Sequence, residues 1–325
     1  MTDTSQSSDT VETVAATPEE PPVSAAPKDS ALPAWLNSLP PFAQPYVALS
    51  RLDRPVGIWL LLLPCWIGVM FTTVTAGFTF YFPLWIVLFA IGSVAMRGAG
   101  CTWNDITDRK FDAGVERTAN RPLPSGQVTL VQAYAWLGAQ LFVGFLVWLC
   151  LPLDAKIVAF LAIPLVVAYP FMKRITWWPQ AWLGMTFNWG VLVAAATVGN
   201  VSLSSVILWL GLACWTVAYD TIYALQDVED DELMGVKSTA RLFGERAVLG
   251  AFCFHLSAGA IIGLASLAIG AERVGGLTAI AFIAHGVWQS YQLRQKTTRD
   301  ALAVFKSNVW AGAVLVAGFF IAALL

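Results

Sequence analysis

Nine apolar blocks follow one another along the chain from Val56 onward. They cover approximately residues 56–76, 81–100, 131–152, 155–171, 181–200, 205–225, 247–270, 274–291 and 307–325. Each block is close to the ~20 residues that an α-helix needs to cross a bilayer. Unpaired backbone groups inside a bilayer are costly, so segments that cross it are expected to be helical. The pattern predicts an all-α, polytopic membrane protein with nine transmembrane helices.

The chain before the first block divides into two parts. Residues 1–33 are rich in Ser, Thr, Pro, Ala and acidic residues and lack apolar periodicity, which predicts a disordered cytosolic tail. Residues 34–55 mix aromatic residues with prolines, which favours an amphipathic segment at the membrane interface, with a plain linker as the alternative. Residues 56–325 then form the transmembrane domain. Its fourth block is short and contains Pro164 and Pro170, so the ends of that helix are hard to place.

Composition agrees with a membrane protein and excludes several other classes. Hydrophobic residues make up 57% of the chain and charged residues only 12%. The basic residues lie between the apolar blocks and form no general basic surface, so a nucleic-acid-binding role is excluded. The five cysteines show no CxxC spacing and are expected to be small buried hydrophobic residues. His255 and His285 are isolated, and packing or an interhelical hydrogen bond is favoured for both.

The lysines and arginines predict the orientation. A cytosolic N-terminus and nine helices place 17 of the 19 lysines and arginines inside, and only Lys156 and Arg273 fall outside. This bias is what the positive-inside rule requires. The long, charged connections then lie on the cytosolic side, where we expect the chemistry.

Two acidic stretches fall on that side. In NDITDRKFD, Asn104, Asp108 and Asp112 recur every four residues and therefore share one face of a helix. In DTIYALQDVEDD, Asp220, Asp227 and Asp231 are spaced by seven and four residues, which again predicts one helical face. Carboxylates on one stripe repel each other unless a cation lies between them.

Two interpretations of these stretches are open. A solvated, charge-laced helix end is the usual explanation of any single such run. Two acidic faces on the same side of the membrane favour instead Mg²⁺ ions that hold a diphosphate, because Mg²⁺ binds one or two carboxylates together with phosphate oxygens.

A diphosphate also needs fixed cations. The candidates in the inside connections are Arg117, Arg121, Lys173, Arg174 and Lys237, with Arg54 and Arg97 as weaker candidates. Each of them alone is better explained as an anchor at the membrane surface. In polar turns that contain proline and glycine, they suit phosphate binding as a group. Tyr219 and Tyr223 lie beside the second acidic stretch and are candidates to line a pocket, where a ring face stabilises a carbocation.

Four segments together carry a resemblance to a known family. They are NDITDRKFD, RTANRPLPSG, YPFMKRITWWPQAWLG and YDTIYALQDVEDDELMGVKSTARLFG. In this order they resemble the intramembrane aromatic prenyltransferases of the UbiA type, in particular those that act on 4-hydroxybenzoate. The resemblance extends from about residue 45 to the end of the sequence and leaves the N-terminal tail without an assigned function.

The resemblance implies a fold, a reaction and a set of ligands. The expected fold has nine helices around a central cavity that opens sideways to lipid and is capped by two charged cytosolic loops. The expected reaction is Mg²⁺-dependent transfer of a polyprenyl group from polyprenyl diphosphate to the ring carbon ortho to the hydroxyl of 4-hydroxybenzoate, a step of ubiquinone synthesis in the bacterial inner membrane. The motifs of the family assign the metal to Asn104, Asp105, Asp108, Asp112, Asp227 and Asp231.

The roles in the reaction are assigned with alternatives. Asp108 and Asp227 hold the metal on the leaving diphosphate, Asp220 or Asp227 polarises the phenol, and Tyr223 faces the cation. Arg174 is the candidate for the carboxylate of the acceptor. A related prenyltransferase with a naphthoate, homogentisate or haem acceptor is the first alternative. A cation- or proton-coupled transporter would need charges or broken helices near the midplane, and a structural scaffold would not explain two acidic faces.

Overall fold

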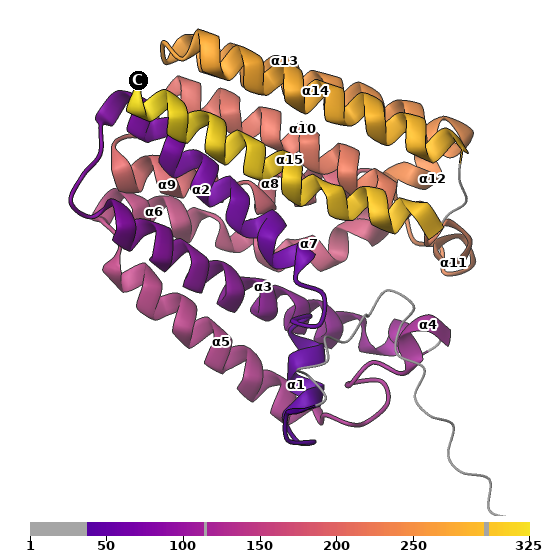
Figure 1. The fold of residues 1–325 in the computed structure, drawn as a ribbon. Helices are drawn as coiled ribbons and strands as arrows, with labels where there is room; N and C mark the ends of the chain where they lie inside the picture. The colour runs from indigo at the N-terminus through magenta and orange to yellow at the C-terminus, as the bar shows by residue number, and fades with distance from the viewer. Residues whose placement is uncertain (1–37, 114–115, 296–298) are drawn as a thin grey trace, which may run out of the picture.

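The computed structural model describes residues 38–113, 116–295 and 299–325, and all regular elements within these ranges are helices (Figure 1). The predicted tail, residues 1–33, and the first residues of the predicted interfacial segment lie outside them. Seven helices are long: α2 (Val56–Ala76), α3 (Phe82–Asp112), α5 (Leu130–Cys150), α10 (Leu203–Ala224), α13 (Ala247–Ala268), α14 (Glu272–Gln295) and α15 (Arg299–Leu324). The shorter ones are α1 (Gln44–Leu49), α4 (Glu116–Ala119), α6 (Leu153–Leu161), α7 (Ile163–Ile175), α8 (Pro179–Phe187), α9 (Gly190–Val198), α11 (Val228–Leu233) and α12 (Thr239–Phe243).

All nine apolar blocks are helical, which confirms the all-α membrane fold. By length and hydropathy, 8 helical segments within the described residues are able to cross a membrane. The remaining block lies in α14, which has 24 residues but is less apolar than its neighbours. It runs beside α13 and α15 (Figure 1). Nine spans therefore stay a prediction.

Two of the spans are broken in the middle. The fourth block divides into α6 and α7 around Ala162, and Pro164 lies in the first turn of α7, where proline needs no hydrogen-bond partner for its nitrogen. The fifth block divides into α8 and α9 at Asn188 and Trp189. The sequence pattern predicted a single helix for each of these blocks. Hydrophobicity alone does not indicate a helix break when the backbone groups at the break are hydrogen-bonded inside the protein.

Side chains supply those partners. Asn188 is buried, and its Nδ2 lies 2.7 Å from the Gly184 carbonyl, 3.1 Å from the Leu212 carbonyl and 2.7 Å from Thr216 Oγ1. Trp189 Nε1 donates to the Val158 carbonyl at 2.8 Å and so joins the two broken spans. The breaks are therefore fixed by hydrogen bonds to neighbouring helices.

The main core lies between α2, α10, α13, α14 and α15. Trp215 is fully buried there, and its Nε1 donates to Asn308 Oδ1 at 2.8 Å. His255 Nε2 contacts the Phe282 carbonyl at 2.9 Å, and His285 Nε2 contacts Ser307 Oγ at the same distance. Both histidines thus make the interhelical hydrogen bonds that the sequence favoured. Tyr219 also packs in this core.

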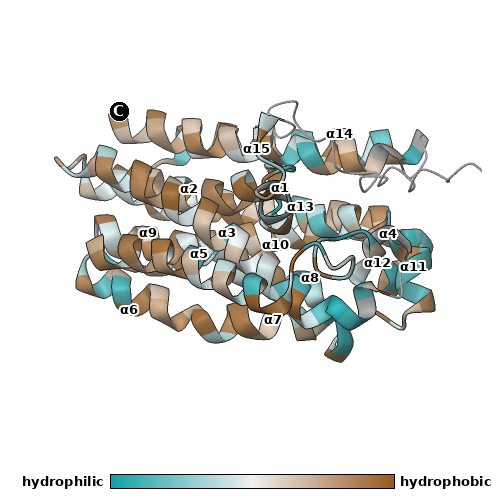
Figure 2. Ribbon diagram, turned by 90° about the horizontal axis from the view of Figure 1, so that it is seen from below, coloured by the Kyte–Doolittle hydropathy of each residue, from teal (hydrophilic) through white to brown (hydrophobic). Residues whose placement is uncertain are grey.

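The two ends of the bundle differ. At one end lie α1, α4, α11 and α12, and hydrophilic residues gather around α4, α11 and α12, whereas the middle of the bundle is mainly hydrophobic (Figure 2). The outer surface of α5 exposes large apolar side chains such as Phe142 and Phe145, as a lipid-facing helix does. The polar end therefore carries both long connections of the chain.

We predict that Asn188→Ala destabilises the protein, because it leaves carbonyl groups around the α8–α9 break without their donor. The expected loss is about 1–2 kcal/mol, which lowers the thermal unfolding midpoint in detergent by a few degrees. The matched control is Ser257→Ala, which removes an exposed hydroxyl that bonds only within its own helix, to the Cys253 carbonyl. Equal midpoints for the two variants would contradict a stabilising role for Asn188.

Candidate active site

The first acidic stretch occupies the last turns of α3, at the polar end of the bundle. Because α3 is continuous from Phe82 to Asp112, Asn104, Asp108 and Asp112 lie on one helical face, as predicted. Asp108 is almost completely buried and Asp112 is largely buried. The sequence thus places carboxylates where they require compensating partners.

The second acidic stretch is not one helix. The helix α10 ends at Ala224, Asp227 precedes the first residue of the short helix α11, and Asp231 lies within α11. The prediction of a single helical face from Asp220 to Asp231 is therefore wrong. The turn at residues 225–227 nevertheless keeps all three carboxylates on one cavity.

Two adjoining cavities open at this end. The mouth cavity, of about 270 Å³, is lined by both acidic stretches and by basic side chains. The inner cavity, of about 260 Å³, is lined by apolar residues together with Arg51, Arg97 and Asp105. Asn104, Arg121, Tyr169 and Tyr223 line both cavities. The residues of the mouth that bear on the chemistry are Asn104, Asp112, Arg121, Tyr169, Lys173, Arg174, Asp220, Tyr223, Asp227, Asp231 and Lys237.

Asp108 is held by two cations from the end of α7. Arg174 Nη2 donates to Asp108 Oδ1 at 2.6 Å, and Lys173 Nζ donates to Oδ2. Both cations also line the mouth cavity. The pairing joins the first acidic stretch to the KRIT segment, and it places two positive charges next to the space that the carboxylates surround.

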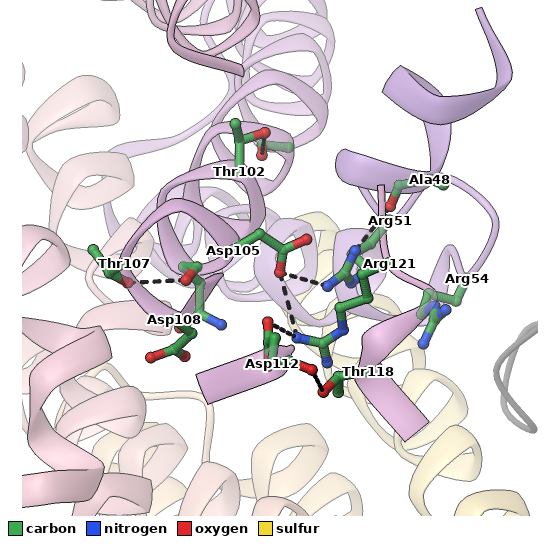
Figure 3. Close-up of polar contacts among 12 residues, drawn as sticks. Ala48, Arg51, Arg54, Thr102, Asp105, Thr107, Asp108, Asp112, Thr118 and Arg121 are labelled. Carbon is green, nitrogen blue, oxygen red and sulfur yellow. Dashed lines mark hydrogen bonds and ion pairs between the residues drawn. The ribbon is translucent and has the colours of Figure 1, made fainter. Parts of the chain in front are cut away.

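A second ion-pair group lies beside it (Figure 3). Arg121 Nη1 is 2.7 Å from Asp112 Oδ2 and 3.5 Å from Asp105 Oδ1, and Arg51 Nη2 is 2.7 Å from the same Asp105 oxygen. Burial raises the pKa of Asp112, and Arg121 opposes that shift. Burial disfavours the charged form of Arg51, but Asp105 outweighs it, and the pKa of Arg51 is raised. Arg51 is therefore held in its charged form beside Asp105.

The other predicted cations are placed differently from one another. Arg97 lines the inner cavity, with its guanidinium carbon 5.3 Å from the centre of the Phe187 ring. Lys237 lines the mouth and donates from Nζ to the Ile175 carbonyl at 3.1 Å. Arg54 pairs with the adjacent Asp53 and lines neither cavity. The side chain of Arg117 lies outside the described part of the chain.

Sequence reasoning missed two cavity residues. Tyr169 lines both cavities, and a signal was present, because it precedes Lys173 by four residues on the same helix and therefore shares its face. Arg51 lines the inner cavity, yet in the sequence it is only one of several basic residues before the first block. Of the two tyrosines considered, Tyr223 lines the cavities and Tyr219 packs in the core.

The donor set suits Mg²⁺ that is shared with a substrate. Among the described residues, no three His, Cys, Asp or Glu side chains converge on a single point. The protein alone therefore does not enclose an ion there. Carboxylate and amide oxygens on two walls of the mouth are what Mg²⁺ needs when substrate phosphates and water supply its remaining ligands. The residues present fit the metal on these terms.

The fold and this site define a class: an all-helical, multi-pass membrane protein with an acid-lined, cation-rich cavity at one end. The chain belongs to the UbiA prenyltransferase family, whose model matches residues 61–324. The resemblance noted in the sequence is thereby confirmed.

Curated relatives and solved structures are similar to the chain over most of its length. It is 43% identical to "4-hydroxybenzoate polyprenyltransferase, mitochondrial" of Aedes aegypti, over 84% of this chain and 62% of the relative's length. It is 42% identical to the protein of the same name from Mus musculus, over 88% of this chain and 76% of the relative.

Among solved structures, the apo structure of a UbiA homolog from Aeropyrum pernix K1 has a TM-score of 0.68 at 24% identity and covers 81% of this chain and 97% of its own. A UbiA homolog from Archaeoglobus fulgidus bound to GPP and Mg²⁺ has a TM-score of 0.64 at 17% identity and covers 86% of this chain and 100% of its own. These likenesses bear on the fold.

Proposed function

We propose that this protein catalyses Mg²⁺-dependent transfer of a polyprenyl group from polyprenyl diphosphate to 4-hydroxybenzoate, on the ring carbon ortho to the hydroxyl, as a step of ubiquinone synthesis. The observation that carries the proposal is the mouth cavity, where two acidic stretches and four predicted cations surround one space. The names of the relatives, and the GPP and Mg²⁺ bound in one solved structure of the family, support the same substrate class.

The mouth cavity is the proposed place of the diphosphate. Asn104, Asp108, Asp112, Asp227 and Asp231 would hold Mg²⁺, which when bound neutralises the diphosphate and makes it a better leaving group. The basic groups that pair with the diphosphate are Arg121, Lys173, Arg174 and Lys237. Arg121 is now paired with Asp112, and Lys173 with Asp108. Diphosphate binding therefore exchanges one set of anionic partners for another at little cost in unpaired charge.

The inner cavity is the proposed place of the aromatic acid. Arg97 lines its wall beside Phe187, so a guanidinium and a ring face meet there. Arg pairs well with a carboxylate, and Phe187 offers a surface for the benzoate ring. The sequence suggested Arg174 for the acceptor carboxylate, but Arg174 lines the mouth and is engaged with Asp108. We therefore assign the carboxylate to Arg97.

The reaction then takes place between the two cavities. The bond between the prenyl carbon and the diphosphate oxygen breaks with both electrons leaving on the diphosphate. The allylic carbon bonds to the ring carbon ortho to the hydroxyl, and that carbon releases its proton. Tyr223 lines both cavities, so its ring lies where positive charge develops. Asp220 lines the mouth and lies about one helical turn before Tyr223 on α10. Either Asp220 or Asp227 polarises the phenol and receives the proton.

We propose that the chain lies in the bacterial cytoplasmic membrane, with the N-terminus and the mouth in the cytosol. The distribution of lysine and arginine supports this orientation. The transporter alternative accounts for the broken spans but not for cations and carboxylates gathered at one end of the bundle. Other aromatic acceptors remain the alternative within the family, and a panel of acceptor acids distinguishes them by product.

We predict that Asp108→Asn and Asp227→Asn each reduce prenyl transfer by about a hundredfold or more, because a lost carboxylate weakens the hold on the metal and the diphosphate. Transfer from radiolabelled polyprenyl diphosphate to 4-hydroxybenzoate is measured across a Mg²⁺ titration. Asp154→Asn, which alters an exposed carboxylate at the opposite end of the bundle, is the matched control and should behave as wild type. Full activity of either site variant would overturn the metal assignment.

We predict that Arg97→Gln raises the KM for 4-hydroxybenzoate by about ten- to a hundredfold, from the loss of a charged hydrogen bond. The KM for the prenyl diphosphate should change little, because Arg97 lines only the inner cavity. Arg246→Gln, at an exposed arginine, serves as the control. The same selective rise in Arg174→Gln, with none in Arg97→Gln, would return the carboxylate to Arg174.

We predict that alkaline phosphatase fused after Gly270 or after Leu325 is active in bacterial cells, and that the same reporter placed in the loop at Gly126 is inactive. Nine spans with an inside N-terminus put the first two positions outside and the third inside. A cytosolic reporter after Leu325 would show that α14 does not cross the membrane, and would reduce the count to eight.

A further inference from the structure

Asp105 lies apart from the carboxylates that line the mouth. It follows Asn104 directly, so on α3 it is turned by about 100° from the face of Asn104, Asp108 and Asp112. Its side chain is 0% exposed, and its Oδ1 is shared between Arg51 and Arg121. It lines the inner cavity, whereas Asp112 lines the mouth, Asn104 lines both cavities and Asp108 lines neither. Its other oxygen, Oδ2, is buried and has no hydrogen-bond partner among the described residues. Because Asp105 lies off the Asn104–Asp108–Asp112 face and beside the inner cavity, it is poorly placed to bind a metal ion in the mouth.

The backbone of Arg51, the first partner of Asp105, has an unusual conformation. The helix α1 ends in a Schellman motif, with Leu52 N bonded to the Val47 carbonyl and Arg51 N bonded to the Ala48 carbonyl, both at 3.1 Å. The residue in the left-handed position is usually glycine, but here it is Arg51, with φ of 56°. Among the residues that the structure describes, it is the one non-glycine residue with positive φ.

The side chain of Arg51 offers a reason for this arrangement. An arginine in the left-handed region is strained compared with glycine. Its Nη1 donates to the Ala48 carbonyl at 2.9 Å, and its Nη2 to Asp105 at 2.7 Å. The turn itself is fixed to α5, because Ser50 Oγ accepts from Trp136 Nε1 at 2.8 Å and from Gln140 Nε2 at 2.7 Å. The guanidinium group is thus directed to Asp105 from a rigid support.

Arg121 completes the arrangement. It lies in the connection after α4, contacts Asp105 at 3.5 Å and Asp112 at 2.7 Å, and lines both cavities. Through its contacts with Arg51 and Arg121, Oδ1 of Asp105 links α3 to the turn after α1 and to the first charged connection (Figure 3). Asp105 is therefore a second anionic partner of Arg121, besides Asp112, at the border of the two cavities.

We infer that Asp105 is a positioning residue and not a metal ligand: with Arg51 beside it, it holds the guanidinium group of Arg121 at the border of the two cavities, where Arg121 binds the diphosphate. The inference rests on the proposed function for the identity of the anion. It replaces the role that the family motif suggested for Asp105. Arg51, which stands outside the acidic motifs and lines only the inner cavity, supports the diphosphate site through Asp105.

Two binding measurements on purified protein test the assignment without turnover. Pyrophosphate binding in the presence of Mg²⁺ is measured by calorimetry. Mn²⁺ binding is measured by electron paramagnetic resonance at a pyrophosphate concentration that saturates each variant, so that the two affinities are read separately. We expect Asp105→Asn to weaken pyrophosphate binding by about tenfold or more, from the loss of an ion pair. The Mn²⁺ half-saturation should stay within about twofold of wild type, whereas Asp108→Asn raises it well beyond that.

Arg51→Gly separates the side chain from the turn. Glycine suits the left-handed position better than arginine does, so this variant keeps α1 and its turn while it removes the guanidinium. We expect the variant to keep its helical signal in circular dichroism, with pyrophosphate binding as weak as in Asp105→Asn. In the double variant the losses should not add, because both changes remove the same contact. Lys306→Gln, at an exposed lysine, is the control.

Three results would overturn the inference. An equal rise in Mn²⁺ half-saturation for Asp105→Asn and Asp108→Asn would make Asp105 a metal ligand. Unchanged pyrophosphate binding in Arg51→Gly would show that Arg51 serves only the turn. Additive losses in the double variant would show that the two residues act separately. Turnover assays with prenyl diphosphate and 4-hydroxybenzoate test the proposed function independently. A wild-type protein that binds pyrophosphate as described but yields no prenylated acid would refute the proposed function and leave the role of Asp105 intact.

Discussion

The site depends on the mutual compensation of buried charges at one end of a helical bundle. The side chains of Asp105, Asp108 and Asp112 are buried on the last turns of α3. A buried carboxylate without a partner would be costly there. Their partners are cations on other segments: Arg51 after α1, Arg121 after α4, and Lys173 and Arg174 at the end of α7. The ion pairs hold these segments around one space. The same ion pairs therefore set the geometry of the candidate active site and hold the polar end of the bundle together.

This balance also explains how a highly charged substrate enters a membrane protein. A diphosphate alone would meet carboxylates, and Mg²⁺ alone would meet lysine and arginine. The two together bring charges of both signs, and each finds partners that are already present in the mouth. Lys173 and Arg174, which hold Asp108 without substrate, are the groups that the diphosphate would take over. The site is therefore matched to the ion pair of metal and diphosphate.

The sequence predicted the parts of the structure that depend on short-range periodicity. The four-residue spacing of Asn104, Asp108 and Asp112 predicted their shared face, because α3 is continuous. The same reasoning failed for Asp220 and Asp231, since a turn at residues 225–227 separates α10 from α11. It also missed the breaks within the fourth and fifth blocks. Those breaks depend on partners distant in the chain, such as the contact of Asn188 with Leu212 and Thr216.

The contacts of the second charged connection with the end of α7, the residues after it and the start of α8 show why spacing alone was insufficient. Lys237 N donates to the Lys173 carbonyl at 2.9 Å, and Thr239 N donates to Gln180 Oε1 at 3.0 Å. Arg241 lies over the Trp177 ring at 5.5 Å. These contacts fasten the segment that carries Asp227 and Asp231 to the segment that carries Lys173. Backbone and aromatic contacts with the wall that carries Lys173 thus position the wall that carries Asp227 and Asp231. These two carboxylates therefore line the cavity although they lie beyond the end of α10.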